Sequence, residues 1–313
     1  MKEYINKLFN IDNLELMNKL PDSSVDLIYC DVLYGTGRDF GDYKDISSNK
    51  QVIYNFYQPR IKEMYRILKE TGSIYLQCDW KINHHLREIM DDIFGVEYFR
   101  NVIVWQRSNG KNNSTKNFEN ATDTIIFYTK SDNYTFNVIK KDLKDSSIKR
   151  YNKVTQDGRR YMVANLMDKQ SYKGKPDVRH INGKEYVSKD KLGYKWSQAK
   201  IDEELKNGTE FVENSEGNLA VIKYLENSNG ANVDNIWNDI YCIVSTDTYA
   251  TQKPKELISR IIQASSNEGD LVADFFCGSG TTCVVAKELR RNYIGCDIGE
   301  KAIHIATNRI LVS

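Results

Sequence analysis

The stretch that decides the fold reads Asp274-Phe275-Phe276-Cys277-Gly278-Ser279-Gly280-Thr281-Thr282. It follows the apolar run Leu271 to Ala273 and precedes a helical pattern, so it predicts a strand, a glycine turn and a helix. Gly278 and Gly280 permit close approach of the backbone to a ligand, and the threonines are suited to cap the helix. The stretch therefore indicates an α/β domain that binds a small molecule at the turn.

The chemistry of the turn disfavours a phosphate ligand. A dinucleotide fingerprint needs a third glycine where Cys283 stands, and a phosphate loop needs a Gly-Lys-Ser/Thr ending. S-adenosylmethionine has no phosphate; its amino group needs a carboxylate, and its ribose diol needs an acid. Asp274 suits the amine. Asp297, after the next predicted strand, suits the ribose by the geometry that places an acid on a dinucleotide ribose.

Working outward, further acids follow predicted strands. Val25 to Cys30 and Ser73 to Cys78 have the apolar pattern of buried strands, and the helical spacing between them predicts a strand, helix, strand unit. Asp31 and Asp79 come directly after these strands. Because ligands of parallel sheets bind at the carboxyl ends of strands, we expect the four acids to form one polar site.

The chain divides into three parts by pattern. Residues 1–134 and 246–313 have α/β patterning, whereas the apolar pattern weakens in residues 135–245. Within this insert, Asn182-Gly183 predicts a hairpin between Val178 and Val187, and a helix is predicted from Ser197 to Asn207, stopped by Gly208. The two flanking parts are predicted to form one domain that the insert interrupts.

Composition narrows the class of protein. The formal net charge of the 313 residues is +1, but lysine and arginine exceed acids by roughly ten between Val138 and Lys200, which favours a local phosphate contact. The six cysteines lack Cys-x-x-Cys pairs, and the four histidines lack metal-ligand spacing. No run of about 18 apolar residues and no apolar signal core are present. We expect a reduced, cytoplasmic protein without metal or membrane.

Several motifs together resemble a known family. Thr251-Gln252-Lys253-Pro254 precedes a predicted helix, Gly269-Asp270 follows it, and the run from Asp274 to Thr282 comes next. This order is similar to motifs ten and one of amino-group DNA methyltransferases in the permuted, beta order, where the catalytic half comes first. Pro21 to Asp31 resembles the approach to motif four. Val233 to Trp237 resembles methyltransferases related to type III modification (Mod) subunits.

The resemblance implies a Rossmann-like S-adenosylmethionine-dependent methyltransferase fold. Its sheet would be mostly parallel, seven-stranded and in circularly permuted order, with residues 135–245 as an inserted target-recognition domain. S-adenosyl-L-methionine is the implied cofactor, and Lys253 is expected at its carboxylate. Asp12 is equally well interpreted as a helix cap. The implied cofactor positions are Asp12, Thr251, Gln252, Lys253, Asp274, Phe275, Phe276, Gly278, Ser279, Gly280, Thr281, Thr282 and Asp297.

The catalytic motif departs from the family pattern. The family usually has Asp-Pro-Pro-Tyr, whereas this chain reads Asp31-Val32-Leu33-Tyr34. Losing both prolines removes rigidity, about 1 kcal/mol per site in unfolded-state entropy. The reacting groups remain: Asp31 and the Leu33 carbonyl accept hydrogen bonds from an exocyclic amine, and Tyr34 offers an aromatic face to a flipped base. Asp31, Leu33 and Tyr34 are the predicted catalytic residues, with phenylalanine expected to replace Tyr34 without loss.

An acid at position 31 resembles the adenine version of the family. The predicted function is site-specific methyl transfer from S-adenosylmethionine to the N6 amine of adenine in double-stranded DNA. Cytosine-N4 methylation, a catalytically disabled DNA-binding relative and a dinucleotide-dependent oxidoreductase are the alternatives left open. A homodimer and a restriction subunit are candidate partners beside DNA.

Basic residues outside the cofactor motifs are the predicted DNA contacts. Three lie in loops near the catalytic strand ends and four in the insert: Arg38, Arg107, Lys111, Arg159, Arg160, Arg179 and Lys195. In the insert they alternate with Tyr161, Tyr172 and Trp196. These aromatic residues are equally suited to form a small core of the insert.

Overall fold

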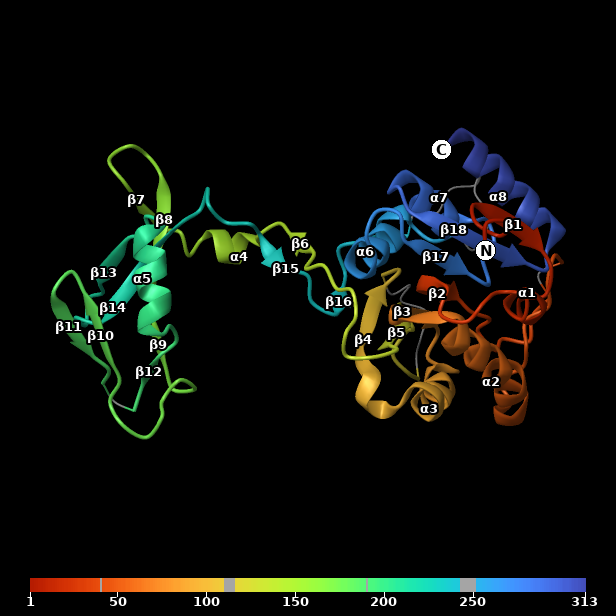
Figure 1. Ribbon diagram of the computed structural model, residues 1–313, viewed down its shortest axis with the longest axis horizontal. Helices are drawn as coiled ribbons and strands as arrows, with labels where there is room; N and C mark the ends of the chain where they lie inside the picture. The colour runs from red at the N-terminus through yellow and green to blue at the C-terminus, as the bar shows by residue number, and fades with distance from the viewer. Residues whose placement is uncertain (40, 110–115, 190, 243–251) are drawn as a thin grey trace. The chain divides into compact units, whose positions relative to one another are not determined.

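The computed structural model describes residues 1–39, 41–109, 116–189, 191–242 and 252–313. The chain divides into two compact units (Figure 1): Met1–Ile139 with Val233–Ser313, and Lys140–Asn232. The second unit is narrower than the insert predicted at 135–245, because both flanks pack on the first unit. On one flank the Asn137 amide donates to the carbonyl of Ala264 at 2.6 Å. On the other, Trp237 and Ile240 lie buried in the first unit's core.

The first unit contains an eight-stranded sheet in the order β1-β18-β17-β2-β3-β5-β4-β16. Every pairing is parallel except the two made by β5, so the sheet is mostly parallel, as predicted. The predicted number was seven. Two of the eight, β1 and β16, correspond to no strand that the sequence pattern predicted, and β16 has only two residues. The strands are β1 (Lys7–Asn10), β2 (Val25–Asp31), β3 (Leu68–Cys78), β4 (Phe99–Gln106), β5 (Thr122–Thr129), β16 (Ile236–Trp237), β17 (Leu271–Asp274) and β18 (Asn292–Asp297).

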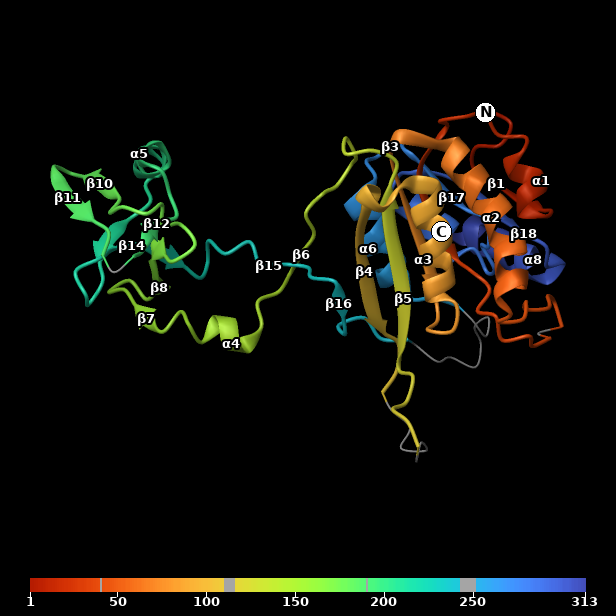
Figure 2. The same ribbon diagram turned by 90° about the horizontal axis from the view of Figure 1, so that it is seen from below.

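Helices cover both faces of this sheet (Figure 2), and β2 alternates between them. Ile28 and Cys30 pack with α1, α2 and α3, whereas Leu27 and Tyr29 pack with α6 and α7. A strand buried on both faces is a continuous apolar run, which is why its sequence pattern identified it. The helices are α1 (Asn13–Met17), α2 (Lys50–Ile67), α3 (Asn83–Phe94), the short 3₁₀ turn η1 (Val96–Tyr98), α6 (Lys255–Ser265), α7 (Thr281–Glu288) and α8 (Glu300–Val312).

The order of strands differs from the order of the chain. β17 and β18 come from the C-terminal part, yet β17 lies between β18 and β2 and pairs in parallel with both. The carboxyl ends of β2, β17 and β18 therefore lie at one edge of the sheet. Two distant parts of the chain contribute to whatever that edge binds.

The second unit has a four-stranded antiparallel sheet, β13-β14-β8-β7, and α5 packs on it through Ile201. The predicted hairpin is confirmed, with Asn182 and Gly183 at positive φ. The predicted helix is confirmed as α5, which Ser197 caps. The elements are β6 (Lys140–Lys141), α4 (Asp145–Ile148), β7 (Lys153–Val154), β8 (Arg160–Asn165), β9 (Met167–Asp168), β10 (Val178–Ile181), β11 (Lys184–Val187), β12 (Gly193–Tyr194), α5 (Gln198–Lys206), β13 (Phe211–Glu213), β14 (Leu219–Tyr224) and β15 (Ala231–Asn232).

Three features of the whole chain bear on its class. All six cysteines are free thiols. In the described ranges no helix combines the length and the apolar character that a membrane crossing needs. The same residues contain no group of three or more His, Cys, Asp or Glu side chains that could hold a metal ion.

The loop after β2 continues the sheet pairing by one residue. The Val32 amide donates to the carbonyl of Gln77 on β3 at 3.0 Å, beside the register pair of Asp31 and Gln77. A proline at position 32 has no amide hydrogen and cannot make this bond. The Leu33 amide, in contrast, donates to no residue in the described part of the chain. A hydrogen bond therefore replaces part of the rigidity that proline would give.

We expect Val32→Pro to lower the free energy of unfolding of the first unit by about 1–3 kcal/mol, because a buried carbonyl loses its donor. Leu33→Pro is the matched control, since it removes no such bond. Urea unfolding can be followed by tryptophan fluorescence in a Trp196→Phe background, because Trp196 is the one tryptophan of the second unit. Equal stability of the two proline variants would contradict this account of the loop.

Candidate active site

A cavity of about 550 Å³ opens at the sheet edge where β2, β17 and β18 end. The four acids that follow predicted strands, Asp31, Asp79, Asp274 and Asp297, all line it. So do these other predicted residues: Asp12, Leu33, Tyr34, Arg38, Arg107, Gln252, Lys253, Phe275, Phe276, Gly278, Ser279, Thr281 and Thr282. The predicted catalytic loop and the predicted cofactor turn thus share one cavity.

Gly280 is the exception among the predicted cofactor positions that the structure describes, because it does not line this cavity. Its φ is +75°, and a Cβ built there would lie 2.6 Å from the Cβ of Ala306 on α8. Helix packing and the turn itself therefore require a glycine at this position. Thr251 and Lys111, also predicted as site residues, lie outside the described residues.

Asp274 ends β17 with 3% of its surface exposed. Its carboxylate accepts from the Thr282 hydroxyl at 2.5 Å and from the Phe276 amide at 3.0 Å. Burial raises the pKa of Asp274 to about 7, although both hydrogen bonds oppose the shift. A cation beside such a carboxyl would favour its charged form. Because the Thr282 hydroxyl donates to Asp274, it does not cap α7. The prediction that the threonines cap this helix is wrong, since Gly280 is the cap residue and makes no side-chain hydrogen bond.

The Asp297 carboxylate accepts a hydrogen bond from a backbone amide of the glycine turn. The Gly278 amide donates to one carboxylate oxygen and the Gly299 amide to the other, each at 2.9 Å. Burial raises the pKa of Asp297 as well. An amide that a phosphate would bind is therefore already paired with a carboxylate, and two acids border the turn. This arrangement disfavours a phosphate and suits a ligand with an ammonium group and hydroxyls.

Arg309 on α8 binds the residues of the glycine turn through its guanidinium. No sequence pattern predicted this role. The guanidinium donates to the Ser279 carbonyl at 2.6 Å, the Ser279 hydroxyl at 2.9 Å and the Thr281 hydroxyl at 3.1 Å. Burial lowers the pKa of Arg309. In sequence it is one basic residue in the last turn of a helix, which is an ordinary feature.

Of the two roles that the sequence left open for Asp12, the helix cap is confirmed, and the cofactor role stays a prediction. Asp12 caps α1 through the amide of Leu14 at 2.9 Å, and it lines the cavity. Its second oxygen accepts from Arg60 at 2.7 Å, and Arg60 also donates to Asn13 at 2.6 Å. The Asn13 amide donates in turn to the Phe275 carbonyl at 2.9 Å. Buried Arg60, which the sequence analysis missed, thereby links α1, α2 and the cofactor turn.

Asp31, the last residue of β2, forms an ion pair with Lys253. Burial raises the pKa of Asp31, and the Lys253 ammonium opposes that shift. The same ammonium lies 5.6 Å from the centroid of the Tyr34 ring. Lys253 was predicted to meet a cofactor carboxylate; in the structure its partner is the predicted catalytic acid.

Tyr34 contributes a hydroxyl as well as a ring. The hydroxyl lies 2.8 Å from Asp31 Oδ1 and 2.9 Å from Asp123 Oδ2. Since a tyrosine hydroxyl has one proton, it donates to one carboxylate at a time. The expectation that only the aromatic face matters at position 34 is therefore incomplete.

Asp123 is a buried acid of the cavity that the sequence analysis missed. It is the second residue of β5, which runs antiparallel to its neighbours, so the start of β5 lies at the edge where the parallel strands end. Its Oδ2 accepts from Gln77 at 2.9 Å, and the Gln77 side-chain oxygen accepts from Tyr29 at 2.7 Å. The sequence analysis considered only acids directly after predicted strands, and Asp123 was missed because it lies at the start of its strand.

The Leu33 carbonyl, the predicted second acceptor, already accepts from the Tyr57 hydroxyl on α2 at 2.7 Å. A carbonyl oxygen has two lone pairs, so one is left for a substrate amine. Tyr57 is buried and was identified from sequence only as part of a helical apolar face. It fixes the loop in the absence of prolines.

The predicted DNA contacts differ in how they are paired. Arg107 lies at the cavity with Nη1 3.3 Å from Asp123 Oδ1, and Arg38 is exposed at the rim. In the second unit, Arg159 pairs with Asp157 at 2.8 Å and Arg179 pairs with Asp177 at 2.6 Å. Those two charges are balanced within the unit.

Arg160 and Lys195 bond to backbone carbonyls and so keep their net charge. Arg160 donates to the carbonyls of Tyr151 at 3.1 Å and Ile148 at 3.2 Å, and Lys195 donates to that of Asn165 at 2.9 Å. Of the four predicted contacts in the insert, these two retain a charge for a partner.

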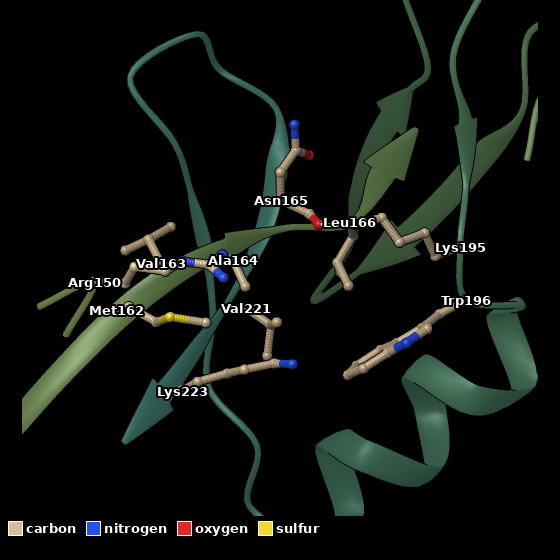
Figure 3. Close-up of a pocket in the computed structure, with 10 residues that line it drawn as sticks. All are labelled: Arg150, Met162, Val163, Ala164, Asn165, Leu166, Lys195, Trp196, Val221 and Lys223. Atoms are coloured by element: carbon tan, nitrogen blue, oxygen red, sulfur yellow. Dashed lines mark hydrogen bonds between the residues drawn. The ribbon is translucent and has the colours of Figure 1, made fainter. Parts of the chain in front are cut away.

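A second cavity, of about 410 Å³, lies in the second unit over β8 and β14 (Figure 3). Apolar side chains and the Trp196 indole line it together with Arg150, Lys195 and Lys223. The Arg150 and Lys223 side chains make no hydrogen bond or ion pair with any residue that the structure describes. Unpaired cations around an aromatic wall suit an anionic, planar ligand. The sequence analysis did not single out Arg150 or Lys223.

Comparison with solved structures identifies the fold of the chain. A putative DNA modification methylase of Thermus thermophilus, complexed with S-adenosyl-L-methionine, is 16% identical, with a TM-score of 0.52 over 98% of this chain and 93% of that one. PvuII DNA methyltransferase, a cytosine-N4-specific enzyme, is 12% identical, with a TM-score of 0.53 over 97% of this chain and 85% of the other. The fold is a mixed α/β methyltransferase fold.

Sequence relatives are DNA methyltransferases. Type II methyltransferase M.EcaI of Enterobacter cloacae is 30% identical over 91% of this chain and 65% of its own length. M.HpaI of Haemophilus parainfluenzae is 27% identical over 95% and 71%, and M1.MboII of Moraxella bovis is 26% identical over 96% and 95%. The N6/N4 DNA methylase profile matches residues 25–308, from the start of β2 into α8. The chain therefore belongs to the N6/N4 DNA methylase family.

Proposed function

We propose that this protein transfers a methyl group from S-adenosylmethionine to the N6 amine of adenine in double-stranded DNA, as the modification enzyme of a restriction-modification system. The observation that carries the proposal is the partly buried Asp31 carboxylate, beside Tyr34 and in one cavity with Asp274 and Asp297. Family membership supplies the reaction class. A carboxylate at position 31 supports adenine over cytosine by the resemblance, in which the cytosine version usually has serine.

The cofactor turn fits S-adenosylmethionine by its chemistry. Asp274 is a buried carboxylate whose pKa of about 7 a neighbouring ammonium would lower, and Asp297 presents an acid for a ribose diol. Phe276 lines the same cavity and offers an apolar surface. When bound, S-adenosylmethionine supplies a methyl group on a positively charged sulfur.

The catalytic loop acts by binding and orienting the target amine. Asp31 and the free lone pair of the Leu33 carbonyl accept its two hydrogens, which directs the nitrogen lone pair out of the base plane. The Tyr34 ring stacks on the extruded base. PvuII DNA methyltransferase, which has a similar fold, is a cytosine-N4-specific enzyme, so the product analysis must distinguish the two bases.

We expect Asp274→Asn to weaken S-adenosylmethionine binding about tenfold to a hundredfold, the loss of one charged hydrogen-bonded contact. Wild-type affinity should fall between pH 7.5 and pH 6, because protonation below about pH 7 neutralises Asp274. The variant should have a weaker pH dependence. Isothermal titration calorimetry measures both, with Asp270→Asn, an acid outside the cavity, as the control. A steep, unchanged pH dependence in Asp274→Asn would refute this assignment.

Methyl transfer itself tests the proposed function. Wild-type protein incubated with S-adenosylmethionine and unmethylated genomic DNA should yield N6-methyladenine, measured by mass spectrometry of digested nucleosides. Asp31→Ala should abolish the product while sparing cofactor affinity, because general-base and orienting groups contribute about a hundredfold or more. N4-methylcytosine as the sole product would replace adenine by cytosine in the proposal. If the protein binds both S-adenosylmethionine and DNA but forms neither methylated base, the hypothesis that it is an enzyme is refuted.

We infer that the second unit contacts the DNA substrate through its cavity. Arg150 and Lys223, which have no ion-pair partner among the described residues, line it beside Trp196. Lys195 also lines it and bonds only to a backbone carbonyl. Phosphate contacts release counterions, so affinity falls with salt. The ion-paired Arg159 and Arg179 stabilise the unit in this proposal, because their charges already have partners.

Lys223→Glu should weaken DNA binding and reduce the slope of log affinity against log salt by about 0.9, the value for one phosphate contact. Lys206→Glu makes the same change of net charge on α5, outside the cavity lining, and is the matched control. Fluorescence anisotropy with a labelled duplex at several salt concentrations measures both. Equal effects of the two variants would refute a specific role for the cavity.

A further inference from the structure

Asp123 has no role in the proposed mechanism, although it is 1% exposed and lines the active-site cavity. Its Oδ2 accepts from Tyr34 and Gln77, while Oδ1 is buried without a hydrogen-bond donor among the described residues. A buried carboxylate so close to the partly buried carboxylate of Asp31 is costly unless cations balance the two charges. Lys253 beside Asp31 and Arg107 beside Asp123 provide that balance.

The side chains of Asp31, Tyr34 and Asp123 form a continuous hydrogen-bonded path. Asp31 Oδ1 lies 2.8 Å from the Tyr34 hydroxyl, which lies 2.9 Å from Asp123 Oδ2. A hydroxyl between two carboxylates can accept a proton from one while giving its own proton to the other. Gln77 fixes the far end of the path by donating to Asp123 Oδ2 at 2.9 Å.

Methylation of an amine requires a place for one proton. As the new carbon–nitrogen bond forms, the methyl–sulfur bond breaks and its electron pair stays on sulfur, which becomes a neutral thioether. The nitrogen gains the positive charge that sulfur loses. A neutral methylated amine results only when nitrogen releases one hydrogen as a proton, and Asp31 is its nearest proposed acceptor.

We propose that Tyr34 and Asp123 form a proton relay that clears this proton from Asp31. The step rests on the proposed function. The amine proton passes to Asp31 Oδ1, then to the Tyr34 hydroxyl oxygen, as the hydroxyl proton passes to Asp123 Oδ2. Asp31 is then ionised again and Asp123 holds the proton, so charge and atoms balance. Asp123 acts through Tyr34 and is a positioning and relay residue that does not touch the substrate.

Asp123→Asn is the decisive variant, because asparagine still accepts a hydrogen bond from Tyr34 but takes up no proton. We expect its single-turnover rate of methyl transfer to fall about a hundredfold, as for loss of a general base. Dissociation constants for S-adenosylmethionine and DNA should be unchanged. Tyr34→Phe should lose a similar factor, and the double variant should be no slower than the slower single variant, since relay members act as a unit.

Tyr128→Phe is the matched control, because Tyr128 also donates to a carboxylate, that of Asp91, but outside the cavity. Its transfer rate should equal that of the wild type. If wild type methylates adenine and Asp123→Asn does so at the same rate, or the double variant loses the product of both factors, the relay is refuted and the proposed function stands. A wild type that binds both ligands and methylates nothing refutes the proposed function and the relay together.

Discussion

The parallel pairing of β17 with β2 is the contact on which the rest of the first unit depends. Val272 and Ala273 pair with Leu27 and Ile28, and the Leu271 amide donates to the Asp26 carboxylate at 2.9 Å. This pairing inserts the C-terminal part of the chain between strands of the N-terminal part. Without it, the cofactor turn after β17 and the catalytic loop after β2 would belong to separate surfaces. In the proposed function the methyl donor and the acceptor amine react at contact distance, which this strand pairing allows by bringing the two loops to one cavity.

Burial of several acids at one edge would destabilise the sheet if each were left alone, and the fold supplies a different partner to each. Asp274 accepts from a hydroxyl of the following helix, Asp297 from two backbone amides, and Asp31 from Lys253. In the proposed function, Asp274 and Asp297 are available to a ligand ammonium group and a diol, and the turn does not suit a phosphate. The same reasoning explains why the glycine turn looks like a dinucleotide motif but lacks its ligand chemistry: its amide is already used by a carboxylate.

Local pattern was enough to predict the strands that carry the site, because a strand buried on both faces is a continuous apolar run. It also located the acids after those strands. It missed Asp123, since β5 runs antiparallel to its neighbours and brings its beginning to the site. Arg60 and Arg309 were missed for another reason: each is a single basic residue on a helix, and only the tertiary fold shows that it binds the turn or α1. In the second unit, Arg159 and Arg179 pair with acids only two residues before them, Asp157 and Asp177, and the sequence does not show which cations pair because that depends on the local backbone conformation.

The catalytic loop shows how a lost covalent constraint changes what neighbouring residues must do. Proline would fix this loop by its ring, whereas here Val32 donates to the Gln77 carbonyl, a bond that proline could not make. The side chain of the same Gln77 donates to Asp123 and accepts from Tyr29. One residue of β3 therefore positions both the backbone of the loop and the far carboxylate that Tyr34 contacts. Rigidity that is local in the family motif is distributed here over β2, β3 and β5, so the geometry of the loop and the position of the Asp123 carboxylate are coupled through Gln77.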